Sequence, residues 1–187
     1  NDNGNAVTDI LAWENTGAVV NVAVDESTGK TNVIQAYRQL IPQDVDEDGV
    51  TEVPFPNWWD SGTDTLTSWR QYSRTGADHL VAQTYHCQSG GWYFQFPQNW
   101  WSCVTIETAE TVAGENQVLV FVNDTEVMAL YTITNENRES RAALGDRFVL
   151  WRQPSTIYAA ELYEAAAMYG MDAQEAKECF HLMGSVW

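Results

Sequence analysis

The chain has 187 residues and carries 26 acidic against 9 basic side chains, a formal net charge of −17. So acidic a chain is repelled by phosphate backbones and anionic lipids, which excludes nucleic acid and anionic membrane surfaces as favourable partners. Hydrophobic residues make up 44% of the chain and include nine Trp, enough for a packed core. No apolar run approaches the ~20 residues of a membrane-spanning helix, and the length suits one domain or two small ones.

The first half of the chain predicts short β-strands. Runs rich in Val, Ile and aromatic residues occur at 11–13, 18–24 and 32–37, with turn-rich segments at 14–17 and 25–30 between them. This pattern is typical of a meander of hairpins.

Two further strands are expected at 65–73 and 79–87, turning at 74–78. Pro54 and Pro56 precede them. Because proline has no N–H to donate to a sheet, this stretch is predicted to be a loop or an edge strand.

Gln88–Gly91 is polar and rich in Gly, and it marks the expected boundary between a domain at 1–88 and another at 89–187. Just after it, Trp92 to Phe96 alternates between large aromatic and other residues, as in a strand with one buried face. Further strands are expected at 102–107, 118–122, 127–134 and 147–151.

The end of the chain predicts two helices. The first rests on a stripe at helical spacing made of Tyr158, Leu162, Ala165 and Tyr169, with Gly170 as its C-terminal cap. Asp172 and Glu175 resemble a capping box that opens the second helix. Its inner face is expected to hold Ala176, Phe180 and Met183. Strands followed by terminal helices predict an α+β fold.

The segment 44–52 has the spacing of a calcium-binding loop. Calcium takes six to eight oxygen ligands, and a short loop supplies them from alternate positions, with Gly at the sixth for the sharp turn. The odd positions here are Asp44, Asp46, Asp48, Val50 and Glu52, and Gly49 is sixth. We therefore predict that these five residues bind Ca²⁺, Val50 through its backbone carbonyl.

An EF-hand is excluded because its twelfth position needs Glu, whereas that position is Phe55 between two prolines. The nine-residue loop instead resembles the calcium loop of FG-GAP (VCBS-type) repeats of integrin α-subunit propellers and bacterial surface proteins. The resemblance covers roughly residues 7–88 and implies a β-meander like one propeller blade. Since a propeller needs about four to eight blades, it also implies either a piece of a longer protein or a lone blade packed on the second domain.

Residues 91–100 read Gly-Trp-Tyr-Phe-Gln-Phe-Pro-Gln-Asn-Trp. This segment resembles the opening of PsbP-like and Mog1-like domains, in which a Gly and an aromatic strand are followed by Pro and, three residues on, Trp. The resemblance covers about residues 89–187. It implies an antiparallel sheet with C-terminal helices, and a binding or structural role without shared catalytic residues.

Residues that carry other chemistry are scattered. His79, His86 and His181 lack the spacing of zinc ligands. The three cysteines, Cys87, Cys103 and Cys179, allow at most one disulfide, and buried thiols are the simpler expectation.

Two adjacent tryptophan pairs, Trp58–Trp59 and Trp100–Trp101, are a further signal. Neighbours on a strand point to opposite faces, so one member of each pair is a candidate for exposure and for stacking on a sugar ring. Packing in the core and its rim is the simpler explanation.

The sequence thus predicts a non-enzymatic, calcium-stabilised module, structural or adhesive, of a bacterial surface protein. Its partner is expected to be a protein or a glycan. Because the chain opens at Asn1 without a charged and apolar leader, we expect a removed signal or a piece of a larger chain. An extracellular or cell-surface location follows, with which a lipid anchor is compatible. Two alternatives stay open: a carbohydrate-binding module that uses exposed Trp pairs, and a glycoside hydrolase that uses two carboxylates.

Overall fold

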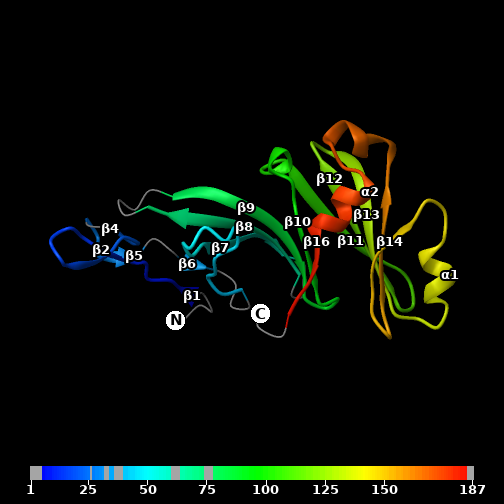
Figure 1. Ribbon diagram of the computed structural model, residues 1–187, viewed down its shortest axis with the longest axis horizontal. Coiled ribbons are helices and arrows are strands. Elements are labelled where there is room, and N and C mark those ends of the chain that lie inside the picture. Colours follow the sequence, from blue (N-terminus) through cyan, green and yellow to red (C-terminus); the bar gives the residue numbers. More distant parts are fainter. Residues whose placement is uncertain are drawn as a thin grey trace. The chain divides into compact units, whose positions relative to one another are not determined.

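The computed structural model describes residues 6–25, 27–31, 34–35, 40–59, 64–73 and 78–184 (Figure 1). The chain divides into two compact units. One contains Asn1–His86 together with Met183–Trp187, and the other contains Cys87–Leu182. Both are built mainly from antiparallel β-strands, and the short helices of the described residues all lie in the second unit.

The first unit opens with three small antiparallel pairs. They are β1 (Ala6–Val7) with β6 (Ile34–Gln35), β2 (Leu11–Trp13) with β3 (Val19–Asn21), and β4 (Val24–Asp25) with β5 (Lys30–Thr31). The strand expected at 11–13 is confirmed as β2. The run expected at 18–24 is divided between β3 and β4, and of the run at 32–37 only 34–35 lies within the described residues.

Asn21 explains why the run at 18–24 is not one strand. Its side-chain oxygen accepts the N–H of Ile10 and that of Ala23, each at 3.1 Å. The second bond is a local turn that competes with extended pairing, so the chain bends at residues 22–23. An Asn inside a β-branched run therefore ends the strand.

Three longer strands follow in the first unit: β7 (Val53–Trp59), β8 (Thr65–Tyr72) and β9 (Asp78–Cys87). They pair in antiparallel order, and β7 lies at the edge. Pro54 and Pro56 lie within β7, opposite Trp69 and Thr67. The sequence predicted that these prolines lie in a loop or an edge strand, and they lie in an edge strand. The turn expected at 74–78 lies outside the described residues except for Asp78, which begins β9.

The second unit contains a five-stranded antiparallel sheet in the order β11-β12-β13-β15-β14. Its strands are β11 (Val104–Val112), β12 (Glu115–Val122), β13 (Thr125–Ile133), β14 (Phe148–Arg152) and β15 (Ile157–Leu162). In the same unit, β10 (Trp92–Gln95) pairs antiparallel with β16 (Phe180–Leu182). The helices are η1 (Gln98–Trp100), α1 (Arg138–Ala142), η2 (Glu164–Tyr169) and α2 (Ala173–Cys179).

The alternation expected from Trp92 to Phe96 is confirmed. Trp92, Phe94 and Phe96 are buried, whereas Tyr93 and Gln95 are half-buried. The Trp92 indole donates from Nε1 to Oγ1 of Thr132 at 2.8 Å, which ties β10 to β13.

The prediction of a helix at 158–169 is wrong for the first half of this segment. Tyr158 and Leu162 lie in β15, and only Glu164–Tyr169 is helical, as the 3₁₀ helix η2. β15 lies between β13 and β14, and its first four residues are all buried. A strand covered on both faces loses its alternation, so the helical spacing of its apolar residues carried no information.

The two caps at the end of the chain are confirmed. Gly170 takes a left-handed backbone (φ 77°) at the end of η2. The Asp172 carboxylate accepts the N–H of Gln174 at 2.7 Å and that of Glu175 at 2.9 Å, which opens α2. The helix ends at Cys179, earlier than expected, because Phe180 pairs with β10 as the first residue of β16.

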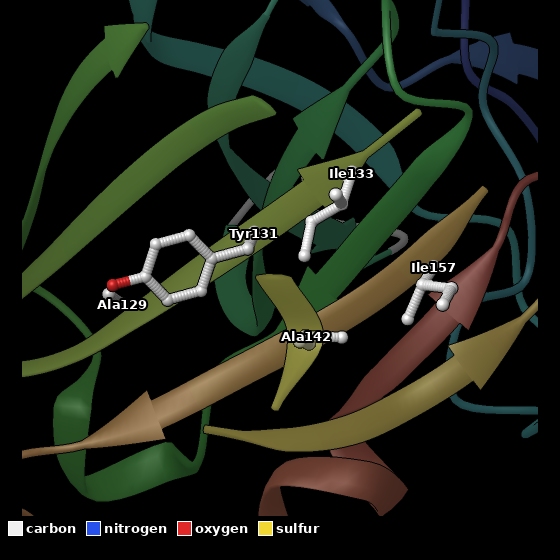
Figure 2. Packing of buried hydrophobic residues seen from close by; sticks show 6 residues of the cluster. Ala129, Tyr131, Ile133, Ala142 and Ile157 are labelled. Atoms are coloured by element: carbon white, nitrogen blue, oxygen red, sulfur yellow. The ribbon is translucent and has the colours of Figure 1, made fainter. Parts of the chain in front are cut away.

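A hydrophobic cluster covers one face of the five-stranded sheet (Figure 2). Its members alternate along two paired strands and are completed by one helix: Ala129, Tyr131, Ile133, Ile157, Ala159 and Ala142. Ala142 belongs to α1, so burial of this small side chain fixes the short helix on β13 and β15.

Candidate metal centre

A backbone bridge closes the acidic loop 44–52 at its two ends. Gln43 and Glu52 form an antiparallel bridge, in which the Gln43 N–H donates to the Glu52 carbonyl at 3.0 Å and the Glu52 N–H to the Gln43 carbonyl at 2.8 Å. The chain between them bends without regular secondary structure, and β7 begins directly after it. The edge strand of the sheet therefore holds both ends of the loop close together.

Carboxylates inside the loop organise its backbone. Asp44 accepts the N–H of Asp48 at 3.1 Å on one oxygen and that of Gly49 at 2.9 Å on the other. Gly49 has φ 86°, a left-handed backbone that glycine adopts without steric cost. The sequence pattern predicted a sharp turn at this position, and the structure has it there.

The loop brings three of the predicted ligands together. Asp44, Asp46 and Asp48 each place a carboxylate oxygen so that the three atoms lie within 4.8 Å of one another. All three side chains are exposed, and among the described residues none of them forms an ion pair. Three converging carboxylates form a hard-oxygen donor set, which suits Ca²⁺ or Mg²⁺ and is poorly suited to soft metals.

Glu52 does not belong to this group of exposed carboxylates. The Glu52 carboxyl is fully buried and accepts the Val45 N–H at 2.8 Å. Burial raises the pKa of Glu52, although hydrogen bonds from Val45 and Gln71 act in the opposite direction. Val50 is exposed, and its N–H donates to Asp48 at 2.8 Å. The buried Glu52 side chain therefore stabilises the loop through its hydrogen bond with the Val45 backbone.

Sequence reasoning missed Gln71. From β8, its amide Nε2 donates to Asp48 at 2.8 Å and to Glu52 at 3.2 Å. The bond from Gln71, followed by that from the Val50 backbone, lowers the pKa of Asp48. A single uncharged side chain thus connects the loop to the sheet, and nothing in the local sequence around Gln71 marks it for this role.

The remaining candidate residues do not gather into a site of this kind. The three cysteines are free, with Cys87 buried and the other two half-buried. In the described part of the chain, the aspartate triad is the one cluster of His, Cys, Asp or Glu with metal-binding geometry. Of the tryptophans, Trp100 is buried and Trp101 half-buried, while the side chains of Trp58 and Trp59 lie outside the described residues.

No family model, curated protein or solved structure matches this chain. The resemblance to FG-GAP repeats and to PsbP-like and Mog1-like domains therefore stays a prediction. Among the described residues, every helix is too short or too polar to cross a lipid bilayer.

Proposed function

We propose that this chain is a non-enzymatic, calcium-stabilised structural or adhesive module of a bacterial surface protein. Its loop 44–52 binds one Ca²⁺ through Asp44, Asp46 and Asp48, aided by the Val50 carbonyl. In this proposal the first unit corresponds to an FG-GAP-like blade and the second to a PsbP/Mog1-like domain. The observation that carries the proposal is the convergence of the three carboxylate oxygens within 4.8 Å.

Electrostatics supports a cation at this position. Three like charges so close together repel one another, and the whole chain adds a net charge of −17 to this repulsion. The loop nevertheless holds the carboxylates in place with bonds from its own backbone and from Gln71. Such an arrangement is stabilised when a divalent ion neutralises it.

Calcium fits the loop better than magnesium. Ca²⁺ accepts six to eight ligands in flexible geometry, whereas Mg²⁺ demands a near-ideal octahedron and retains several waters. An open loop with exposed aspartates suits the less demanding ion. Extracellular calcium modules bind at about 10⁻⁴–10⁻³ M, and the proposal assigns the loop to this class.

The test is thermal unfolding of the whole chain in chelator, in Ca²⁺ and in Mg²⁺. We expect Ca²⁺ to raise the melting temperature and Mg²⁺ to do so far less. Asp46→Asn and Asp48→Asn should abolish the calcium-dependent rise. Asp146→Asn removes one exposed acidic group from another part of the chain and should keep the rise. An equal response of all variants would mean non-specific screening, and it would contradict the proposal.

A further inference from the structure

A groove of about 480 Å³ opens on the second unit, and none of its lining residues belongs to the acidic loop. Its size lies in the range of small-ligand sites, about 300–1,000 Å³. The residues that matter for recognition are Gln95, Gln98, Trp101, Glu175, Glu178 and His181. They come from β10, η1, the turn after it, α2 and β16.

The register of β10 and β16 forms one side of this groove. Phe94 lies opposite Phe180, and both are buried, so the neighbouring positions face the other way. Tyr93 lies opposite His181, and their rings stack at 4.8 Å between centroids. Gln95, one strand alternation from Tyr93, shares this outward face. The strand pair therefore presents an imidazole and an amide to the groove.

Trp101 supplies a rigid aromatic surface. Its indole Nε1 donates to the Phe96 carbonyl at 3.0 Å, which fixes the ring. The neighbouring Trp100 is buried and donates to the Tyr169 carbonyl at 2.8 Å, which fixes this turn to the end of η2. Because Trp101 is only half-buried and lines the groove, part of its aromatic surface is available to a ligand.

The charge of the groove excludes anionic ligands. Glu175 and Glu178 lie three residues apart on α2 and therefore share one face of the helix. Gln174 holds Glu178 through a bond of 2.7 Å. No Lys or Arg lines the groove, and burial lowers the pKa of His181, which keeps its imidazole neutral near pH 7.

We propose that this groove binds a neutral oligosaccharide built from pyranoses with equatorial hydroxyls. The equatorial hydroxyls of such a sugar leave a flat apolar ring face that stacks on Trp101. Its hydroxyls can donate hydrogen bonds to the carboxylates of Glu175 and Glu178. They can also donate to the amide oxygens, and accept from the amide N–H groups, of Gln95 and Gln98. An organic ammonium ion only donates, and it would leave the amide N–H groups without a partner.

The experiment is calorimetric titration of the full chain with three neutral hexasaccharides, cellohexaose, xylohexaose and chitohexaose. Spermidine serves as the cationic probe and hexagalacturonate as the anionic one. We expect at least one neutral sugar to bind in the millimolar range or tighter, and hexagalacturonate not to bind. Binding of spermidine without binding of a neutral sugar, or no binding of any neutral sugar at millimolar concentration, overturns the proposal.

Variants then assign the binding to this groove. Trp101→Ala and Glu175→Gln should each weaken sugar binding about tenfold or more, with circular dichroism verifying the fold. Trp101→Phe keeps an aromatic ring and should retain part of the affinity if the alanine variant fails to fold. Trp151→Ala removes an exposed tryptophan from β14 of the same unit and should leave affinity unchanged. Wild-type affinity in both Trp101→Phe and Glu175→Gln would overturn the assignment.

Discussion

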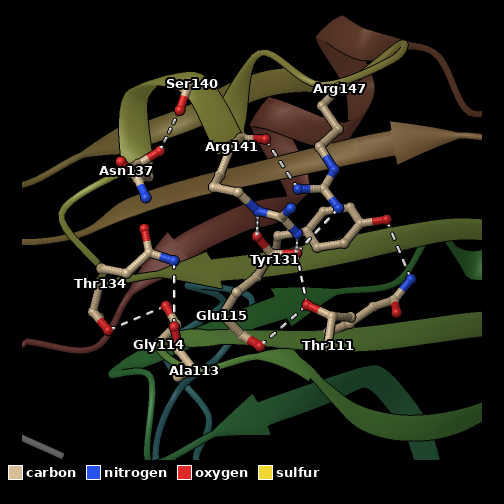
Figure 3. A network of polar contacts seen from close by, with 12 residues as sticks. Thr111, Ala113, Gly114, Glu115, Tyr131, Thr134, Asn137, Ser140, Arg141 and Arg147 are labelled. Carbon is tan, nitrogen blue, oxygen red and sulfur yellow. Dashed lines mark hydrogen bonds and ion pairs between the residues drawn. The ribbon is translucent and has the colours of Figure 1, made fainter.

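Glu115 carries a full charge at a position with no solvent exposure, because its carboxylate accepts four hydrogen bonds, two of which are also ion pairs (Figure 3). Arg141 contacts both of its oxygens, at 2.6 and 2.8 Å, and Arg147 reaches one at 3.1 Å. The Thr111 hydroxyl donates to the same carboxylate at 2.7 Å and lies 3.4 Å from the backbone carbonyl of Glu115. The Arg147 guanidinium also lies 3.6 Å from the centre of the Tyr131 ring. This network joins β11, β12, β13 and α1.

Removal of the Glu115 charge should destabilise the chain strongly. Glu115→Gln removes the buried carboxylate that Arg141 and Arg147 share and leaves Arg147 only its longer contact with Glu161, so we expect a loss of about 3 kcal/mol in the free energy of unfolding. The matched control is Glu139→Gln, which breaks the exposed pair with Arg152 and should cost less than about 1 kcal/mol. Urea unfolding followed by fluorescence compares the two, and equal losses would contradict a structural role for the network.

The pKa of Glu115 predicts a pH dependence. Burial acts to raise this pKa, but hydrogen bonds from Arg141, Thr111 and Arg147 outweigh it and lower the pKa to about 2 from 4.5. Because the folded state binds this proton less readily than the unfolded state, the stabilisation is complete above about pH 4.5 and is lost as the pH falls toward 2. The stability difference between wild type and Glu115→Gln should therefore shrink over this window. A difference that stays constant down to pH 2 would refute the assignment.

At the scale of the element, α2 depends on one cap. Asp172 accepts two N–H groups of the first turn, at 2.7 and 2.9 Å, in a helix of only seven residues. Asp172→Ala should cost about 1 kcal/mol, or roughly 2–4 °C in melting temperature for a chain of this size. Asp172→Asn keeps an acceptor oxygen and should recover most of the loss. If Asn were as damaging as Ala, charge rather than capping would be responsible.

Elements whose signal is local were predictable from the sequence. The cap at Asp172, the turn at Gly49 and the alternation at Trp92–Phe96 each depend on residues a few positions apart. β15 was not predictable, because residues distant in sequence cover both of its faces: Ala142 packs with Ile157 and Ala159, and the Phe180 ring lies against Tyr158. The division of the run at 18–24 could have been found from Asn21, whose side chain favours turns.

In the candidate metal centre, too, the features with a local signal were predictable and those made by distant residues were not. Asp44, Asp46 and Asp48 are candidate ligands at fixed local spacing, so the sequence was sufficient to group them. Gln71 enters the site through the pairing of β7 with β8, which a local pattern does not encode. Glu52 has the correct spacing, yet its side chain is buried and accepts hydrogen bonds from Val45 and Gln71.

For the whole molecule, the proposed Ca²⁺ site predicts a gain in stability, since a bound divalent cation offsets part of the net charge of −17. At a Ca²⁺ concentration about 100 times Kd, binding to the folded state alone adds about 2.7 kcal/mol to the free energy of unfolding. For a chain of this length we expect a rise of about 5–10 °C in melting temperature. Excess NaCl screens repulsion without filling the loop, so it should not reproduce this rise. Differential scanning calorimetry in chelator, NaCl and CaCl₂ makes the comparison.

Direct calcium titration by calorimetry tests the central claim most directly. The proposed site predicts one Ca²⁺ per chain with a Kd of about 10⁻⁴–10⁻³ M, and no binding after Asp46→Asn combined with Asp48→Asn. The Asp146→Asn variant should bind as the wild type does, because Asp146 lies outside the acidic loop. Absence of binding heat at millimolar Ca²⁺, together with a melting temperature that does not respond to chelator, would contradict the account.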